Sequence, residues 1–241
     1  MSDPSVYSCC ELGAAREAYA ASVSTPLSPA LAALDARTAA VLRQAHMVSG
    51  ALAAATLRLL VKVSASVRAL EIGTYTGFSA IAIAEALPEG GTITTVDSFV
   101  DEIEAKPIFR DAVASLPERT ARKIVPVEAD ADAYLAELAG RVKSGTVQPF
   151  DFVFLDADKM RQLAQFELMV ESGIVRAGGL VVVDNTLWYS RVVRGEGDAT
   201  TRAVDGFNKA VAADERAEVV QLPMRDGLTV IRVVGAAKGE G

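Results

Sequence analysis

The pattern of hydrophobic and polar residues divides the chain into two parts. From about Glu11 to Lys62, Ala, Leu, Arg and Glu recur with helical spacing, interrupted only by Pro26 and Pro29. This part predicts three helices, near residues 9–22, 29–44 and 49–63. Beyond it, short segments rich in β-branched residues alternate with helical stretches.

The second part predicts an α/β fold with a doubly wound, mostly parallel sheet, because strands and helices alternate along it. Two strand segments, FVFLD and LVVVD, are almost continuously apolar, as expected when helices cover both faces of a sheet. The last two strands flank Pro223–Gly227 and predict an antiparallel hairpin at the sheet edge. The expected strands are Val67–Ile72, Thr92–Asp97, Ile124–Glu128, Phe152–Asp156, Leu180–Asp184, Val219–Leu222 and Thr229–Val234. The expected helices between them are Phe78–Leu87, Glu102–Leu116, Asp132–Val142 and Gln162–Val175.

Length and composition indicate one globular domain over residues 1–241, with residues 1–63 as an N-terminal helical extension and 64–241 as the α/β core. No apolar run approaches the roughly 18 uncharged residues of a membrane span, and no signal peptide is expected. Adjacent Cys9 and Cys10 are typical of a reduced cytoplasmic protein. A net charge of −7 makes nucleic acid an improbable partner.

Carboxylates follow several of the predicted strands, where an open α/β sheet binds its ligands. The first of these strands leads into LEIGTYTGFS, a glycine-containing turn that opens a helix. Gly73 and Gly77 permit a tight turn with close approach of a ligand, but Tyr75 stands where a dinucleotide site needs glycine. Asp97 ends the next strand, where a carboxylate holds a ribose diol. A nucleoside without a pyrophosphate, such as S-adenosylmethionine, fits this pattern.

A second group of polar residues follows two later strands. Asp156 and Asp184 end these strands, Asn185 adds an amide oxygen, and Lys159 lies three residues after Asp156. Oxygen ligands without His or Cys favour Mg²⁺, with Ca²⁺ or Mn²⁺ as alternatives. The single histidine, His46, is expected to be structural.

These motifs resemble one known family. The chain is similar, over about residues 40–234, to the class I, S-adenosylmethionine-dependent and divalent-cation-dependent O-methyltransferases of the caffeoyl-CoA and catechol type. The resemblance rests on five segments in order: HMVS from His46, LEIGTYTGFS, FDFVFLDADK, GGLVVVDNTLW and FNKAVAADERAEVVQLPMRDGLTVIRV. It implies a Rossmann-like methyltransferase fold with a seven-stranded sheet and a homodimer.

The resemblance also implies a role for individual residues. Those implied to bind S-adenosylmethionine are Met47, Ser49, Glu71, Gly73, Thr74, Ser79, Asp97, Asp130, Ala131 and Asp158. Those implied to hold the metal are Asp156, Asp184 and Asn185. Lys159 matches the general base, with Asp156 and Asn185 beside it in the catalytic group, while Trp188 and Tyr189 are expected to contact the acceptor.

The predicted reaction is methyl transfer to one hydroxyl of a catechol-like vicinal diol small molecule. The alternative is a tRNA hydroxyuridine O-methyltransferase, since some bacterial relatives modify tRNA. The chain departs from the family pattern at Ala129, Gln162, Tyr189-Ser190 and the segment Ser98–Pro117. Most of these departures lie at the expected acceptor rim, which predicts an acceptor other than the lignin-type CoA ester. The loop Tyr189–Thr200 is a candidate lid, given Gly195 and Gly197.

Overall fold

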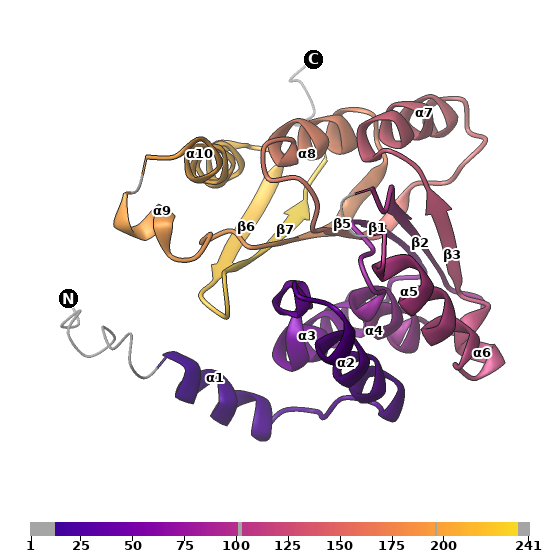
Figure 1. The fold of residues 1–241 in the computed structure, drawn as a ribbon. Coiled ribbons are helices and arrows are strands. Elements are labelled where there is room, and N and C mark those ends of the chain that lie inside the picture. Colours follow the sequence, from indigo (N-terminus) through magenta and orange to yellow (C-terminus); the bar gives the residue numbers. More distant parts are fainter. Residues whose placement is uncertain (1–12, 101–102, 196, 236–241) are drawn as a thin grey trace, which may run out of the picture.

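The computed structural model describes residues 13–100, 103–195 and 197–235. Its centre is a seven-stranded mixed sheet in the order β3-β2-β1-β4-β5-β7-β6 (Figure 1). The strands are β1 (Arg68–Ile72), β2 (Thr92–Asp97), β3 (Ile124–Glu128), β4 (Phe150–Leu155), β5 (Val175–Asp184), β6 (Ala217–Leu222) and β7 (Leu228–Val233). The first five strands are parallel, and β7 is antiparallel to both of its neighbours. The predicted fold class is confirmed, including the hairpin at the sheet edge.

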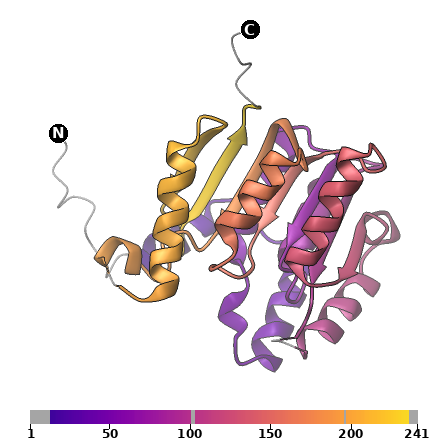
Figure 2. The ribbon, with the colours of Figure 1, turned by 90° about the horizontal axis from the view of Figure 1, so that it is seen from above.

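Helices cover both faces of the sheet (Figures 1 and 2). One layer contains α7 (Ala131–Lys143), α8 (Gln162–Glu171) and α10 (Ala199–Ala213). The opposite layer contains α2 (Pro29–Val41), α3 (Gly50–Val63), α4 (Phe78–Ala86), α5 (Ala105–Ala114) and α6 (Glu118–Ala121). The remaining helices are α1 (Gly13–Ser22), the 3₁₀ turn η3 (Ala45–Met47) and α9 (Arg191–Arg194).

The two layers explain the continuously apolar strands. Along β4, the side chains of Phe152 and Phe154 pack into the core beneath α3 and α4, whereas Val153 and Leu155 pack beneath α7 and α8. Successive strand residues point to opposite faces, so a strand covered on both sides must be apolar at every position. Burying these side chains stabilises the sheet by roughly 1.5–3 kcal/mol per large residue.

The segment between β5 and β6 differs most from the prediction, because α9 and α10 were not expected there. The helix α10 begins at Asp198, whose carboxylate accepts a hydrogen bond from the amide of Thr201 (2.9 Å). Its buried residues Thr201, Val204, Phe207 and Val211 recur at helical spacing, so the helix was readable from the sequence. The helix predicted to reach Val175 ends at Glu171, because Gly173 turns the chain with a φ of +72° and β5 begins at Val175.

One stretch of the described chain, Ala45–Val63, has the length and hydropathy of a membrane-spanning helix. Core helices of soluble proteins pass the same test, and α3 packs Ala54, Leu57 and Val61 into the hydrophobic core beside α4. Its outward face carries Arg58 and Lys62 among apolar residues. The stretch is therefore weak evidence for a membrane span.

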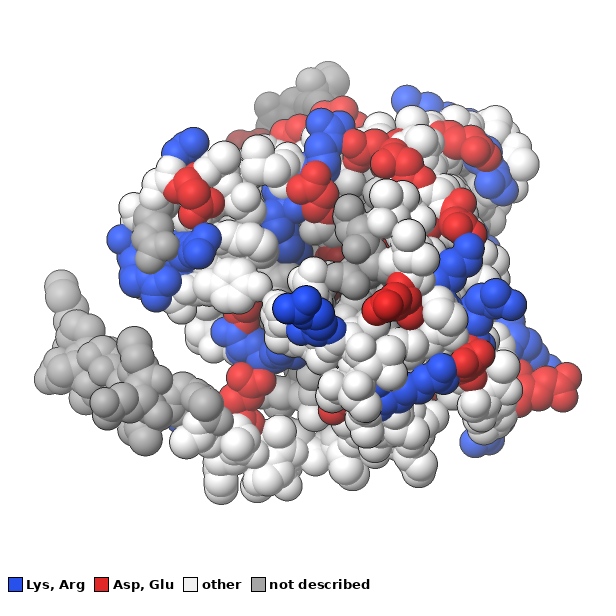
Figure 3. Space-filling view, viewed as in Figure 1, with Lys and Arg blue, Asp and Glu red and all other residues white. Residues whose placement is uncertain are grey.

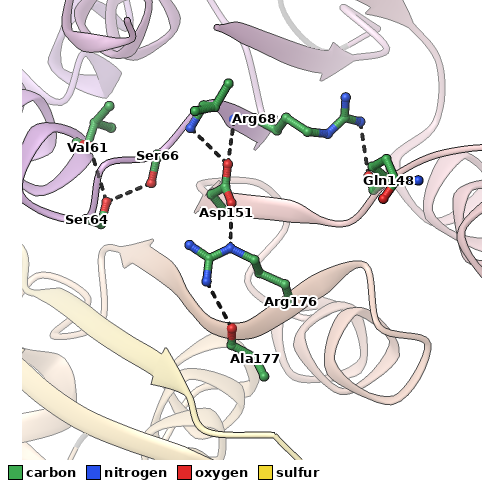
Figure 4. Close-up of polar contacts among 9 residues, drawn as sticks. Val61, Ser64, Ser66, Arg68, Gln148, Asp151, Arg176 and Ala177 are labelled. Atoms are coloured by element: carbon green, nitrogen blue, oxygen red, sulfur yellow. Dashed lines mark hydrogen bonds and ion pairs between the residues drawn. The ribbon is translucent and has the colours of Figure 1, made fainter.

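Opposite the ligand-binding edge, the amino-terminal ends of three strands are held by the carboxylate of Asp151 (Figure 4). One oxygen accepts hydrogen bonds from the amides of Val67 (2.9 Å) and Arg68 (2.8 Å), and the other accepts from the guanidinium of Arg176. Burial alone would raise the pKa of this carboxyl, but the hydrogen bonds from Arg176 and the two amides outweigh it and lower the pKa. Asp151 thus links β1, β4 and β5 at the end away from the site.

We expect Asp151→Ala to lower the free energy of unfolding by about 2–4 kcal/mol, since it leaves two amides and a guanidinium without their charged acceptor. Because the pKa is depressed in the folded state, this contribution is present above the unfolded value of 3.8 and is lost as the pH falls below it. Urea unfolding at pH 7 and pH 3 measures both effects. If Asp151→Ala lowered the free energy of unfolding equally at pH 7 and pH 3, the stabilisation would not depend on the ionised carboxylate of Asp151.

Candidate active site

The candidate site is a cavity of about 940 Å³ at the carboxyl ends of the central strands. All of the sequence-predicted site residues except Glu71 line it. On the cofactor side these are Met47, Ser49, Gly73, Thr74, Ser79, Asp97, Asp130, Ala131 and Asp158. On the transfer side they are Asp156, Lys159, Asp184, Asn185, Trp188 and Tyr189. Segments more than a hundred residues apart in sequence therefore form one cavity.

The glycine turn after β1 is shaped by contacts within the protein. Gly73 has a φ of +98°, and a Cβ at this position would overlap the backbone carbonyl of Asp156. A Cβ at Gly77, whose φ is +85°, would overlap the ring of Phe109. Both glycines are required, but the close approach is made by β4 and α5, whereas the sequence predicted a close approach by the ligand.

Asp97 organises the same turn. Its Oδ2 accepts hydrogen bonds from the amides of Thr74 and Tyr75, both 2.9 Å, and its Oδ1 accepts from the amide of Phe99 (2.7 Å). A carboxylate offers about four lone-pair sites, so three amides leave capacity for a ligand hydroxyl. Asp97 therefore holds the turn in place and still presents an acceptor to the cavity.

Glu71 lies beneath the turn, fully buried, and does not line the cavity. Its carboxyl accepts a hydrogen bond from the hydroxyl of Thr95, which also hydrogen-bonds to Thr74 (2.6 Å). Burial raises the pKa of Glu71 to about 8, and the hydroxyls of Ser79 and Thr95 offset only part of this effect. Glu71 therefore supports the floor of the site and does not line the cavity, unlike the other residues expected to bind the cofactor.

At the other end of the cavity, the ammonium of Lys159 donates a hydrogen bond to Oδ1 of Asp156 (2.9 Å) and another to the backbone carbonyl of Asp184 (3.2 Å). Lys159 is only 8% exposed. Burial, followed by the charge of Asp156, raises the pKa of Asp184 well above its usual range, even with Lys159 nearby. This part of the site therefore holds more negative charge than its single lysine balances.

The predicted metal ligands are two carboxylates and the amide of Asn185, whose φ of +60° turns it at the end of β5. Across the described residues, no three His, Cys, Asp or Glu side chains gather as a metal site. The donor set is thus small and all oxygen, which suits a hard cation that keeps open positions for other oxygen ligands. The unbalanced negative charge at Asp156 and Asp184 fits such a cation.

The rim beyond Asn185 is aromatic. The rings of Trp188 and Tyr189 meet edge to face with centroids 5.1 Å apart, and Tyr189 is 54% exposed. Trp188, Tyr189 and Ser190 follow one another with φ between +46° and +57°. Consecutive left-handed conformations are costly for side-chain-bearing residues and persist only where surrounding contacts enforce them. The predicted lid segment begins here and contains α9 and the first residues of α10.

Three cationic residues lie beside this rim. Arg191 stands over the ring of Tyr189 at 5.9 Å, Arg194 donates to the carbonyl of Tyr189 (2.9 Å), and Arg202 donates to the carbonyl of Gly197. Figure 3 shows Lys and Arg side chains gathered over α9, in contrast to the overall negative charge. The contacts with Tyr189 brace its strained backbone.

Sequence reasoning missed several residues that line the cavity. Arg161, the residue before α8, and Gln165 of α8 both donate hydrogen bonds to Asp132 of α7, at 2.6 and 2.8 Å, and join the two helices beside Asp130. From the hairpin between β6 and β7 come Arg225 and Asp226. The turn sequence PMRDG marked a hairpin, but no sequence signal placed its tip against the site.

A second cavity, of about 930 Å³, lies between α2, α4, α5 and α6. It contains none of the predicted site residues. Charged side chains that line it pair with each other, as in Arg37 with Asp111 and Arg122 with Glu89, both at 2.6 Å. We therefore assign the chemistry to the cavity at the strand ends.

Comparison with known proteins identifies the family to which the chain belongs. The O-methyltransferase family model matches residues 21–234, most of the chain. The chain belongs to the S-adenosylmethionine-dependent O-methyltransferase family. Caffeoyl-CoA O-methyltransferase 1 of Zea mays is 39% identical over 187 residues, which cover 74% of this chain and 68% of the relative. Tricin synthase 1 of Oryza sativa subsp. japonica is 34% identical over 193 residues, covering 77% and 74% of the two chains.

Solved structures agree with this O-methyltransferase assignment. The O-methyltransferase TomG from Streptomyces achromogenes, solved with S-adenosylmethionine, superimposes with a TM-score of 0.76 at 27% identity, covering 92% of this chain and 96% of TomG. An O-methyltransferase from Bacillus cereus, solved with S-adenosylhomocysteine, gives a TM-score of 0.74 at 25% identity, covering 92% and 99%. The predicted family and enzyme class are confirmed, and the solved relatives bind the predicted cofactor or its product.

The raised pKa of Glu71 makes the stability of this O-methyltransferase depend on pH. Above the unfolded value of 4.5 the unfolded chain loses the Glu71 proton, while the folded protein keeps it up to about pH 8. The free energy of unfolding should therefore fall by up to about 1.4 kcal/mol per pH unit across this window. Glu71→Gln removes the titrating group, so the variant should gain stability relative to the parent from pH 5 to pH 8. Urea unfolding of the parent and of Glu71→Gln at pH 5 and pH 8 measures this effect. If the difference in the free energy of unfolding between the two proteins were the same at both pH values, Glu71 would titrate normally.

Proposed function

We propose that this O-methyltransferase transfers a methyl group from S-adenosylmethionine to a hydroxyl of a catechol-like vicinal diol, with the help of a divalent cation of the Mg²⁺ type. The observation that carries the proposal is the meeting of Asp156, Lys159, Asp184 and Asn185 at one end of the cavity. The other end presents Asp97 on a turn suited to a nucleoside. In this proposal the cofactor and the acceptor bind in separate, adjoining parts of the cavity.

In this arrangement the cofactor lies along the glycine turn. Asp97 accepts hydrogen bonds from the ribose hydroxyls, and Asp130 and Ala131 border the base at the start of α7. Asp158, whose carboxylate also accepts from the amide of Met160 (2.9 Å), faces the amino group of the methionine part. Ser49 and Met47 close the cavity from the N-terminal side.

Asp156, Asp184 and the amide oxygen of Asn185 would hold the cation, whose charge offsets the two carboxylates. S-adenosylmethionine supplies the electrophilic methyl group, and a bound dication favours the ionised form of a phenol, whose free pKa is near 10. Lys159 is the proposed acceptor of the phenolic proton, once its ammonium has released a proton to solvent. Its hydrogen bonds to Asp156 and to the carbonyl of Asp184 orient the amine toward the cavity.

The acceptor is proposed to be a small aromatic molecule placed against Trp188 and Tyr189. Relatives named for caffeoyl-CoA and for tricin support a phenolic acceptor. The tRNA-directed alternative has no support from these relatives. The cations beside the rim that an RNA would use already contact the protein at Tyr189 and Gly197. By the same resemblance we propose a cytoplasmic homodimer, which light scattering in solution would test.

Methyl transfer to a panel of catechols, with Mg²⁺ and with EDTA, tests the proposal. We expect product only with the metal, and we expect Asp184→Ala to lose at least 100-fold in turnover while S-adenosylhomocysteine binding stays within about threefold. Calorimetry measures the binding. Full activity in EDTA would remove the metal from the proposal, and turnover of tRNA that contains hydroxyuridine but of no catechol would redirect it to RNA.

Lys159→Met tests the general base. The side chain keeps its volume but loses the amine, and positioned proton acceptors contribute about 10²–10⁴-fold to rate. We expect turnover to fall by that factor with cofactor affinity almost unchanged. Lys209, an exposed lysine of α10 paired with Asp205 (2.6 Å), gives the matched control Lys209→Met, which should retain full activity. Equal rates in both variants would leave Lys159 with a structural role only.

A further inference from the structure

We propose that Arg225 and Asp226, at the tip of the β6–β7 hairpin, are positioning residues that separately fix the cofactor wall and the acceptor wall of the active site. The inference rests on the proposed function for the names of these walls. The two side chains are neighbours in sequence, yet they contact opposite sides of the cavity. Each wall is built from a segment distant in the chain from the hairpin.

Arg225 holds the N-terminal side. Its guanidinium donates hydrogen bonds to the backbone carbonyls of Val48 and His46, and it lies 3.8 Å from the carboxylate of Glu17 in α1. Gly50 makes this approach possible, since a Cβ there would overlap the guanidinium. The planar fork of an arginine suits two acceptors at once, which a lysine cannot reproduce.

The two carbonyls bracket residues of the cofactor wall. Met47 lies between His46 and Val48 in sequence, and Ser49 follows them; both line the cavity. This segment contains the short 3₁₀ turn η3 and the buried side chain of Val48, while Met47 is 44% exposed. Arg225 therefore fixes the backbone on both sides of Met47, through hydrogen bonds to carbonyls of this wall alone.

Asp226 holds the opposite side. Its carboxylate accepts a hydrogen bond from the amide of Tyr189, and its backbone carbonyl accepts from the amide of Leu187 (2.7 Å). The next residue continues the attachment, because Gly227 accepts from the amide of Thr186 (3.1 Å) and a Cβ on Gly227 would lie 2.6 Å from the nitrogen of Leu187. The hairpin thus binds the whole segment that carries Trp188.

This attachment explains how the strained rim persists. Trp188, Tyr189 and Ser190 all adopt left-handed backbone conformations, which relax unless external contacts oppose them. The Asp226 carboxylate is bound at the centre of these residues, on the Tyr189 amide. Removing it frees the aromatic pair to turn away from the acceptor, while the Arg225 contacts remain.

The test uses two readouts that report the two walls separately. S-adenosylhomocysteine affinity, by calorimetry, reports the cofactor wall. Acrylamide quenching of tryptophan fluorescence reports the acceptor wall, because Trp188 is the only tryptophan of the chain. The acceptor KM for whichever catechol is turned over gives a third readout. The variants are Arg225→Ala and Asp226→Ala, each with a conservative partner, Arg225→Lys and Asp226→Asn.

We expect Arg225→Ala to weaken S-adenosylhomocysteine about tenfold with quenching unchanged, in line with loss of charge-assisted hydrogen bonds. Asp226→Ala should leave that affinity within twofold, while quenching at least doubles and the acceptor KM rises about tenfold. Asp226→Asn keeps an acceptor oxygen and should behave as the parent, whereas Arg225→Lys should not restore cofactor affinity. Glu218→Ala, which breaks the exposed Glu218–Arg232 pair of the same hairpin (2.9 Å), is the matched control and should move no readout.

If either Ala variant changed both S-adenosylhomocysteine affinity and acrylamide quenching, the proposal would be overturned. The hairpin tip would then have a general structural role. If an Ala variant fails to fold, the conservative variants decide: parent-like cofactor affinity in Arg225→Lys, or increased quenching in Asp226→Asn, would contradict it. Failure of the proposed function is seen separately. It would abolish turnover or cofactor binding in the parent, while the quenching response of Asp226→Ala would still be measurable.

Discussion

The contact between Gly73 and the backbone carbonyl of Asp156 is the constraint on which the site depends. Because Gly73 has no Cβ, the ends of β1 and β4 can approach each other closely. The glycine turn after β1 and Asp156 after β4 therefore lie at the same level of the sheet. Two further bonds fix this register, from the Asp156 amide to Ile72 and from the Gly73 amide to Val96, both 2.9 Å. Any larger residue at position 73 would separate the methyl donor from the groups that act on its acceptor. Such reactions gain much of their rate from position alone.

Negative charge is the second constraint, and the site handles it differently at its two ends. At Asp97, three backbone amides stabilise the carboxylate without any cation. At Asp156 and Asp184, Lys159 is the nearby cation, and the pKa of Asp184 remains raised. Glu71, buried below the turn, has a raised pKa that keeps its carboxyl neutral. Four acidic residues that look alike in sequence, each at or near a strand end, therefore have three physical roles.

This difference shows what the sequence could and could not predict. The alternation of strands and helices, the helices on both faces and the carboxylates at the strand ends follow from local patterns, because periodicity and apolar runs are set by burial on each face. Glu71 was assigned to the cofactor by its motif, but its alternation along β1 points it into the core, where Thr95 meets it. The helix α10 has a cap at Asp198 and buried residues Val204, Phe207 and Val211 at helical spacing, so the sequence contains the signal for this helix although the predicted elements omit it. Arg225 could not have been found, since its acceptors are backbone carbonyls about 180 residues earlier, which carry no side-chain signal.

The hairpin tip also shows that the proposed acceptor rim and the proposed cofactor site are fixed by different parts of the fold. The glycine turn, Asp97 and Asp156 are fixed by strands at the centre of the sheet, whose packing leaves little freedom. The rim after Asn185 is fixed instead by a few bonds to the sheet edge, through Asp226, Gly227 and the arginines of α9. Bonds of this kind can be rearranged without disturbing the core. If the rim contacts the acceptor as proposed, changes at the sheet edge would alter the choice of acceptor without disturbing the central strands.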